Sequence, residues 1–307
     1  MAFSKVAAFG WENCARLTNG HAELIVTLEI GPRILSYRAT GGENILRAFP
    51  DQLGKSGEPD YQVRGGHRIW IAPETERTYA PDNAPVQFDF REPGTLHLTV
   101  PGMAPWHVRK EMILSLSAGS TAVRIEHRAT NDGAEPTSLA TWGLTIPIPG
   151  GVEIIPQPPL GKHGEGGFLP SRVIVPWSYT DFSDDRWKIG RRYWLLHPKP
   201  GRPATKLGFA LPDRWVGYQV ANQLFLKIFE FDPAATYPDL GCNYETFSKG
   251  DFIELESLGP LQTLAPGESA SHTETWHLFD GIAPPDSLEE TALEKWLEPF
   301  LGKTGLF

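Results

Sequence analysis

Short stretches in which apolar and polar residues alternate recur along the chain. In HVRKEMILSL at 107–116, every second residue from Val108 to Leu116 falls on one mainly apolar face. TAVRIEHR at 121–128 follows after an Ala-Gly-Ser turn and alternates in the same way. A period of two is typical of a β-strand with one face in water. The two stretches therefore predict a half-solvated hairpin.

Other stretches predict strands with more burial. AELIVTLEI at 22–30 and RILSY at 33–37 are dense in β-forming residues and are separated by Gly31-Pro32, which predicts a strand pair. QLFLKIFEF at 223–231 is apolar on both faces, as expected of a strand between two layers. We expect this run to lie in the core.

Glycine and proline limit the other kinds of structure. The chain has 31 Gly and 28 Pro, which recur every ten to fifteen residues and leave no room for long helices. Only 286–301 (DSLEETALEKWLEPFL) has helical spacing, with Asp286 or Ser287 as the expected N-cap. No internal repeat and no flexible linker is evident. We therefore predict one all-β domain of stacked antiparallel sheets over 1–307, with a short C-terminal helix.

Charge and composition exclude several classes of function. The chain has 28 Lys and Arg against 37 Asp and Glu, a net charge of -9, and no basic cluster, so we expect no nucleic-acid partner. No apolar run is long enough for a membrane span, and the N-terminus lacks a signal-peptide pattern. We expect no membrane association and a cytoplasmic location. Cys14 and Cys242 are expected to be free thiols.

A first candidate site is VRGGHRIWIAPE at 63–74. Guanidinium groups hold hydroxyl or anionic oxygens in fixed directions, an indole face stacks on a sugar ring, and imidazole titrates near neutrality. The glycine pair allows close backbone approach. The set suits a sugar or polyol, and ordinary salt bridges around a glycine turn are the alternative. Its candidate residues are Arg64, His67, Arg68, Trp70 and Glu74.

A second candidate site is the acidic strand in 242–260. Alternation sends Glu254 and Glu256 to one face, together with Phe252 and Leu258. A carboxylate in partly apolar surroundings has a raised pKa and can act as an acid or base near neutral pH. A solvated strand face would show the same alternation. Glu245 is a weaker third candidate.

Motifs of several other chemistries are absent from the sequence. There is no GxSxG, GxxxxGK[ST], HExxH or strand-linked GxGxxG. Metal ligation by His67 with Glu74, or by Glu245 with Glu256, stays open because spacing does not show whether these residues meet. Our prediction is for no metal and no cofactor.

These segments resemble the galactose-mutarotase-like superfamily. The resemblance covers most of the chain and is most specific at FIELESLGPLQTLAPGESASHTETWHLF, 252–279, where a Glu strand is followed by a Leu-x-Pro-Gly-Glu turn and a closing strand. It implies a β-supersandwich that binds sugars in an open cleft. It also implies that Glu256 is the general base and that Arg64, in an Arg-Gly-Gly like that of sugar-phosphate epimerases, contacts substrate.

The sequence departs from the family pattern at one position. SLATWGLTIP places Trp142 where the family has its general-acid histidine. Because mutarotation needs an acid for the ring oxygen, His67 or His163 would have to supply the proton, or the reaction does not occur. Fold and function separate easily, so the fold inference is unaffected.

These observations predict a carbohydrate-binding protein with a mutarotase-like cleft and a small-molecule sugar as partner. The predicted activity is aldose 1-epimerase-like isomerisation. A non-catalytic sugar-binding protein and a polysaccharide lyase or hydrolase are the alternatives. The expected roles are Glu256 as base, His67 as acid, Arg64 and Arg68 as oxygen clamps, Trp70 and Trp142 as ring platforms, and Glu74, Glu245 and Glu254 as further contacts.

Overall fold

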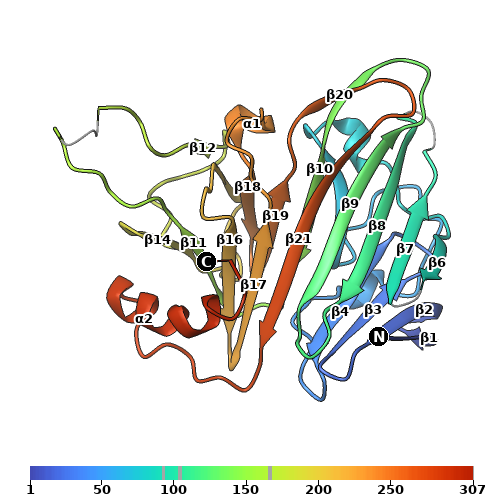
Figure 1. The fold of residues 1–307 in the computed structure, drawn as a ribbon, viewed down its shortest axis with the longest axis horizontal. Helices are drawn as coiled ribbons and strands as arrows, with labels where there is room; N and C mark the ends of the chain where they lie inside the picture. Colours follow the sequence, from blue (N-terminus) through green and yellow to red (C-terminus); the bar gives the residue numbers. More distant parts are fainter. Residues whose placement is uncertain (92–93, 103–105, 165–167, 307) are drawn as a thin grey trace.

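A computed structural model describes residues 1–91, 94–102, 106–164 and 168–306. Nearly all regular structure in these residues is β, arranged in one sheet of 11 strands and one of 10 (Figure 1). The paired strands of both sheets run antiparallel, for example β8 with β9 and β17 with β21. The prediction of an all-β fold of large antiparallel sheets is confirmed. None of the helices in the described ranges is long and apolar enough to cross a membrane.

The first sheet contains, in spatial order, β1 (Ala2–Ala8), β2 (Trp11–Thr18), β3 (Ala22–Thr27), β4 (Arg33–Ala39), β5 (Gly66–Ala72), β10 (Thr137–Ile146), β19 (Phe252–Leu258), β18 (Tyr244–Lys249), β15 (Thr205–Phe209) and β12 (Ile174–Pro176), and β20 (Gln262–Leu264) pairs with β10. The second sheet contains β13 (Trp187–Ile189), β14 (Tyr193–Leu196), β11 (Val152–Pro156), β16 (Trp215–Val220), β17 (Gln223–Phe229), β21 (Ser269–Phe279), β9 (Val123–Asn131), β8 (Val108–Leu116), β7 (Thr95–Val100) and β6 (Gln87–Arg91). The short helix α1 (Pro238–Gly241) and the C-terminal helix α2 (Glu290–Leu301) complete the regular structure, with 3-10 turns at Pro50–Gln52 and Glu76–Tyr79.

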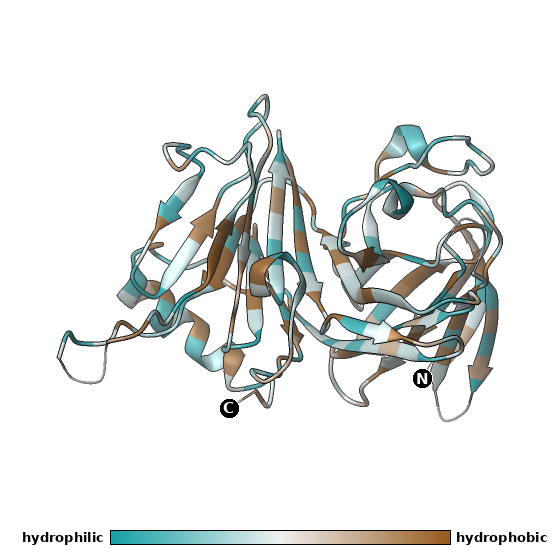
Figure 2. Ribbon diagram, turned by 90° about the horizontal axis from the view of Figure 1, so that it is seen from above, coloured by the Kyte–Doolittle hydropathy of each residue, from teal (hydrophilic) through white to brown (hydrophobic). Residues whose placement is uncertain are grey.

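The strands predicted from alternation form where they were expected. The stretches 22–30 and 33–37 contain β3 and β4, which pair antiparallel across Gly31-Pro32. The stretches 107–116 and 121–128 contain β8 and the start of β9, which also pair. Period-two alternation is visible along many strands as alternating bands of hydropathy (Figure 2).

The core lies between the inner faces of the two sheets. Tyr37 of β4 contacts Phe225 of β17 and Trp276 of β21, with ring centroids 6.2 and 5.6 Å apart. All three side chains are fully buried. Large aromatic side chains from both sheets therefore interlock, which fixes the distance between the sheets.

The strand β17 is buried on both faces, as the sequence predicted. Its inner face packs in the core, and α2 covers its outer face through Leu293 and Leu297. The helix begins at Glu290, with Glu289 as N-cap, so the expectation of a cap at Asp286 or Ser287 is wrong. The Ser287 hydroxyl instead accepts a hydrogen bond from the Glu289 backbone and closes a turn before the helix.

A buried ammonium group joins the two sheets. Lys227 of β17 donates hydrogen bonds to the backbone oxygens of Gly143 and Leu255, both at 2.8 Å. It also pairs with Glu274 of β21 at 3.0 Å, and neither side chain of this pair is exposed. Removal of one partner of a buried ion pair strongly destabilises a protein, because the charge of the other partner stays buried and uncompensated.

We expect Lys227→Met to lower the free energy of unfolding by about 3 kcal/mol or more. Lys188→Met is the matched control, because Lys188 is partly exposed and pairs with the exposed Glu289. The control should change stability by less than about 1 kcal/mol. Urea unfolding of both variants measures the difference, and equal losses would contradict a special role for the buried pair.

Candidate functional site

A cleft of about 410 Å³ lies on the outer face of the first sheet. On β19, Ile253 and Leu255 point into the core, so Glu254 and Glu256 point to the opposite face and line this cleft. The volume falls within the range of small-molecule sites. The aromatic side chains that line it include Tyr61, Trp70, Tyr79, Trp142 and Tyr179, and the charged ones are Arg68, Glu74, Lys206, Lys249, Glu254 and Glu256.

Strand register brings distant parts of the sequence together on the cleft floor. Arg68 of β5 lies opposite Leu144 of β10, which lies opposite Glu256 of β19. Two residues after Arg68 on β5, Trp70 lies directly opposite Trp142 of β10. The segment 63–74 and the acidic strand, nearly two hundred residues apart, thus contribute to one concave surface.

One ion pair on the floor joins Arg68 to Glu254. Arg68 Nη2 donates to Glu254 Oε1 at 2.9 Å, and the side chains are 3% and 11% exposed. The guanidinium lies 4.6 Å from the Trp70 ring centroid and 5.7 Å from that of Tyr61. Aromatic faces and a carboxylate therefore hold the guanidinium in a fixed orientation at the cleft.

A second ion pair involves a residue that sequence reasoning missed. Lys206 Nζ lies 3.0 Å from Glu256 Oε2 and 2.8 Å from Glu245 Oε2. The ammonium also lies 4.7 Å from the ring centroids of both Trp142 and Trp177. The signal available in the sequence is weak: a single lysine in the short strand TKLGF, on the face opposite its apolar residues.

Burial dominates the ionisation of the carboxyls beside Lys206. Burial raises the pKa of Glu256 to about 7, against the lowering effect of the Lys206 ammonium. Burial also raises the pKa of Glu245 well above its usual range. A carboxyl that titrates near neutrality can accept and return a proton under physiological conditions. Glu256 is therefore suited to general base chemistry.

The structure places His67 outside the cleft. Because Arg68 faces the cleft, the preceding residue on the strand faces the core. His67 is fully buried there, 2.9 Å from Thr145 Oγ1 and 2.7 Å from His127 Nε2. Burial lowers its pKa well below the ordinary value, so the imidazole is neutral. The expectation that His67 is the acid of the cleft is not supported by its position.

Both ring nitrogens of His67 have polar partners. Nδ1 lies 2.9 Å from Thr145 Oγ1 and Nε2 lies 2.7 Å from His127 Nε2, and the direction of both hydrogen bonds depends on the tautomer. The imidazole pair is thus an internal polar contact between the sheets.

The same interior region contains a possible set of metal ligands. Ligand atoms of His67, His127 and Glu274 lie within 4.8 Å of one another. Lys227, 3.0 Å from Glu274, already supplies a positive charge there. The sequence left two pairs of metal ligands open. Glu74 and His67 do not meet, because Glu74 is exposed at the cleft and His67 is in the core. Glu245 and Glu256 do meet, but around the Lys206 ammonium.

Arg64 is also outside the cleft. Its side chain is fully buried and donates to Glu58 at 2.7 Å, to Asn83 at 2.9 Å and to the Gln52 backbone oxygen at 2.6 Å. It holds together the segment that precedes β5, and Val63 and Tyr61 of that segment reach the cleft. Arg64 thus shapes the wall of the site without lining it.

The adjacent glycines serve backbone packing rather than ligand approach. A Cβ on Gly65 would lie 2.2 Å from the Arg47 carbonyl oxygen, and one on Gly66 would lie 2.1 Å from that of Ile34. Both glycines have positive φ. The close approach inferred from the sequence is real, but its partner is the protein's own backbone.

The remaining predicted residues have distinct positions. Glu74 is exposed at the cleft, where it accepts a hydrogen bond from the Tyr79 hydroxyl. Trp142 forms part of the floor and is 1% exposed. Glu245 is fully buried behind Lys206. His163, the other acid considered, is exposed between β11 and β12 and does not line the cleft.

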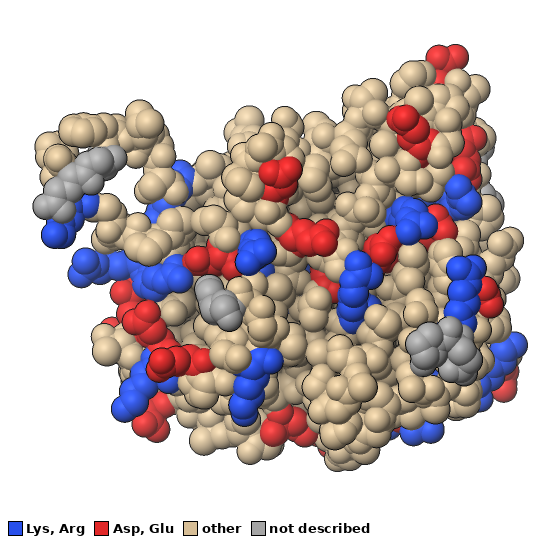
Figure 3. Space-filling view, viewed as in Figure 1, with Lys and Arg blue, Asp and Glu red and all other residues tan. Residues whose placement is uncertain are grey.

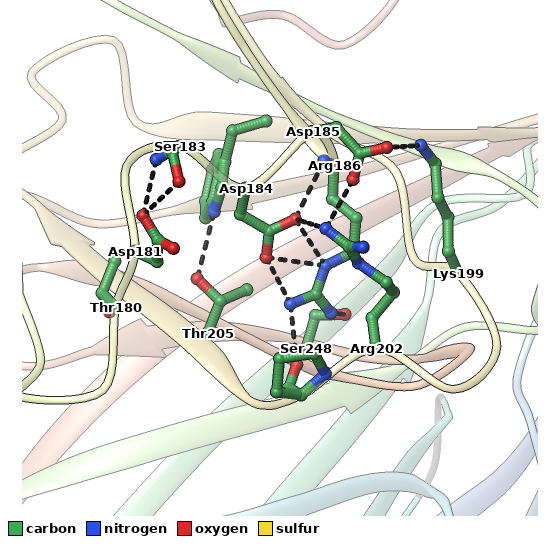
Figure 4. A network of polar contacts seen from close by, with 12 residues as sticks. Thr180, Asp181, Ser183, Asp184, Asp185, Arg186, Lys199, Arg202, Thr205 and Ser248 are labelled. Atoms are coloured by element: carbon green, nitrogen blue, oxygen red, sulfur yellow. Dashed lines mark hydrogen bonds and ion pairs between the residues drawn. The ribbon is translucent and has the colours of Figure 1, made fainter.

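A network of charges fixes the loop 177–187 beside the cleft (Figure 4). Arg186 Nη2 donates to the Asp184 carboxylate at 2.6 Å and to the Pro203 backbone oxygen at 2.7 Å. Arg202 donates to Asp184 from the other side at 3.2 Å. Asp184 thus joins the loop to the residues immediately before β15.

This loop contacts the backbone of Lys206 directly. The Thr180 hydroxyl donates to the Lys206 carbonyl oxygen at 2.5 Å and accepts from its backbone N–H at 3.2 Å. Trp187 Nε1 donates to the Thr205 hydroxyl at 3.1 Å. The same loop supplies Tyr179 to the cleft. The network therefore positions one wall of the cleft.

Neighbouring aspartates in this network allow a matched comparison. Asp184 is buried and pairs with the fully buried Arg186, whereas the side chain of Asp185 is 63% exposed. We expect Asp184→Asn to lower the free energy of unfolding by about 3 kcal/mol, because the buried Arg186 guanidinium then lacks the negative charge of Asp184. Asp185→Asn should cost less than about 1 kcal/mol. Similar urea midpoints for the two variants would refute the assignment.

Comparison with known proteins places the fold. A scan against family models gives no match, and neither does a search of curated proteins. Solved structures do match: the Slr1438 protein from Synechocystis has a TM-score of 0.58 at 14% identity, over 91% of this chain and 99% of that one. A galactose mutarotase-like protein from Lactobacillus casei has a TM-score of 0.58 at 13% identity, over 87% and 100%. A proposed aldose 1-epimerase from Escherichia coli K12 has a TM-score of 0.51 at 15% identity, over 86% and 98%.

The chain therefore has the galactose mutarotase-like fold over 86 to 91% of its length, at low sequence identity. The resemblance stated from the sequence is confirmed at the level of structure. Identity this low establishes the fold alone, so the activity has to be argued from the cleft.

Proposed function

We propose that the cleft binds a small carbohydrate and that Glu256 removes the proton of its anomeric hydroxyl, as in aldose 1-epimerisation. The observation that supports this proposal best is the position of Glu256. Its carboxyl lies on the floor of an aromatic cleft, and burial raises its pKa to about 7.

The lining of the cleft suits a sugar ring. Trp70 and Trp142 lie side by side with ring centroids 5.4 Å apart, and Tyr61 lies 5.3 Å from Trp70. Both indoles are buried, at 7% and 1% exposed, and lie beneath Arg68 and Lys206, so they support the floor and the expectation that they act as ring platforms is not supported. The aromatic surface open to the CH face of a pyranose comes from Tyr79 and Tyr179, which are 44% and 45% exposed. The Arg68 guanidinium and the Glu254 carboxylate offer a donor and an acceptor for hydroxyl groups on the same floor. Positive and negative side chains are also interspersed on the face of the molecule shown in Figure 3. No patch of a single sign on that face favours a highly charged ligand.

The proposed reaction consists of two balanced proton transfers. Glu256 takes the proton of the anomeric hydroxyl, the C1–O1 bond gains double-bond character, and the C1–O5 bond breaks as the ring oxygen takes a proton from a solvent water molecule. The hydroxide that remains takes this proton back when the ring closes. Rotation about C1–C2 and the reverse steps give the other anomer. The sequence of steps returns Glu256 to its starting state, so no net acid or base is consumed.

A non-catalytic sugar-binding protein is the second candidate, and one observation favours it. Among the described residues that line the cleft there is no histidine. Lys206 does not replace it, because the nearby carboxylates raise the pKa of Lys206 well above its ordinary value despite its burial. Burial raises the pKa of Tyr179 to about 12. These groups donate hydrogen bonds more readily than protons.

Replacement of the proposed base separates the two candidates. We expect Glu256→Gln to reduce the rate of anomer interconversion, followed by polarimetry on a panel of aldoses, by about 100-fold or more. The exposed Glu298 of α2 provides the control Glu298→Gln, which should keep the natural rate. Ligand-induced thermal shifts should persist in both variants. Binding without faster interconversion in the natural chain would leave the sugar-binding function alone.

The pH profile provides a further test. Glu256 acts as a base only when ionised, and its pKa is about 7. The rate should therefore decline about tenfold per pH unit on the acid side of this value and level off on the alkaline side. Polarimetry in buffers across this range measures the profile. A rate that is independent of pH through neutrality would contradict Glu256 as the base.

A further inference from the structure

Two carboxyl groups share one ammonium group at the edge of the cleft. Lys206 Nζ lies 2.8 Å from Glu245 Oε2 and 3.0 Å from Glu256 Oε2. The two glutamates are register partners on the adjacent strands β18 and β19, so their side chains leave the sheet on the same face. Glu245 is 0% exposed and Glu256 is 1% exposed.

Two negative charges and one positive charge cannot all be accommodated at low cost in this setting. Water does not reach the three groups freely, so a net charge of minus one is expensive. Two carboxyls this close normally retain a proton between them. The charge balance therefore requires that one of the two glutamates is protonated at neutral pH.

The surrounding groups do not supply another positive charge. Arg68 already pairs with Glu254, and Lys227 on the inner face of the sheet already pairs with Glu274. The other titratable groups near the pair, on the cleft side, beneath the sheet or beside Glu245, are Glu74, Tyr179, Glu153, Asp239 and Cys242. None of these is cationic, so they do not favour a second ionised carboxyl. Lys249 of the cleft lining is cationic, but it is exposed at the end of β18, four residues from Glu245.

We propose that Glu245 bears this proton and is a positioning residue, a neutral group 2.8 Å from Lys206 Nζ, while the ammonium donates its hydrogen bond to Glu256 and is balanced by Glu256 alone. The catalytic consequence, an ionised Glu256 beside the ligand, rests on the proposed function. The location of the proton does not. Glu245 itself does not line the cleft, so it acts through Lys206.

Burial and hydrogen bonding favour Glu245 over Glu256 as the protonated partner. Neither carboxyl oxygen of Glu245 has a hydrogen-bond partner among the described residues, although Oε2 lies 2.8 Å from Lys206 Nζ. A charged oxygen without a donor is more costly to bury than a neutral one. Burial also raises the pKa of Glu245 well above its ordinary value, and Glu256 raises it further, although Lys206 opposes both. Glu256 lines the cleft and can exchange protons with a ligand there.

Carbon NMR of the glutamate carboxyls, assigned with Glu245→Gln and Glu256→Gln, tests the assignment. In the natural chain near neutral pH, Glu245 should give a carboxylic acid signal and Glu256 should titrate. A carboxylate signal from Glu245 under these conditions would overturn the proposal. This measurement needs no activity, so it remains informative if no sugar is turned over.

The Glu245→Gln variant distinguishes a protonated Glu245 from an ionised one, because the two states predict different titration midpoints for Glu256. Because glutamine imitates a protonated glutamate, Glu245→Gln should leave the titration midpoint of Glu256 and the pH profile of the rate in place. If Glu245 were ionised, the same change would give Glu256 the whole ammonium charge and lower its midpoint by about one pH unit or more. A midpoint lowered in this way would refute the inference.

Two further variants keep the test decisive if Glu245→Gln fails to fold. Glu256→Gln removes a like charge, so the Glu245 midpoint should fall by about one pH unit or more. Lys206→Met removes the cation, so the Glu256 midpoint should rise by a similar amount. Unmoved midpoints in both variants would show that the three groups are not coupled. If the titrations behave as expected but no sugar binds, the proposed function fails and the proton assignment stands.

Discussion

The alternation of side chains across the first sheet is the constraint on which the site depends. Each strand that forms the cleft floor has one face toward the aromatic core and one toward the cleft, so neighbouring residues have opposite environments. His67 and Arg68 differ by one position, yet the first is a neutral imidazole between the sheets and the second is a guanidinium on the cleft floor. On the floor of the cleft, β5, β10, β15 and β19 therefore contribute only every second residue, and β18 and the surrounding loops supply the rest of the lining.

Balanced buried charges recur on both faces of this sheet. Lys227 pairs with Glu274 within the second sheet and connects it to the first through the backbone oxygens of Gly143 and Leu255, and Arg186 with Asp184 fixes the loop that borders the cleft. On the cleft side, each of the two glutamates of β19 pairs with a cation that lies over a tryptophan. Such pairs fix the orientation of side chains as much as they contribute free energy, because removal of either member leaves the charge of the other buried away from water. The cleft is thus held in one geometry before any ligand arrives.

The fold alone does not establish an activity, so the functional conclusion depends on the side chains of the cleft. Structures from three bacteria share the architecture at 13 to 15% identity, which leaves room for different side chains at every polar position. In this chain Trp142 and Lys206 together occupy the region around Glu256, with the ammonium 4.7 Å from the indole ring. An aromatic surface and a fixed positive charge there favour binding and stabilisation of an ionised base. They do not replace an acid.

Periodicity in the sequence was sufficient for the fold class, for the strands around Gly31-Pro32 and 107–128, and for the shared face of Glu254 and Glu256. These properties follow from local alternation, which a single strand displays. What depends on pairing between distant strands could not be derived in this way. Strand pairing brings Lys206 to Glu245 and Glu256, packing of one sheet on the other brings His67 to His127, and contacts with Glu58 and Asn83 turn Arg64 into its own loop. The physical reason is that spacing along a strand specifies a face, whereas a contact also requires knowing which strand lies beside it and in which register.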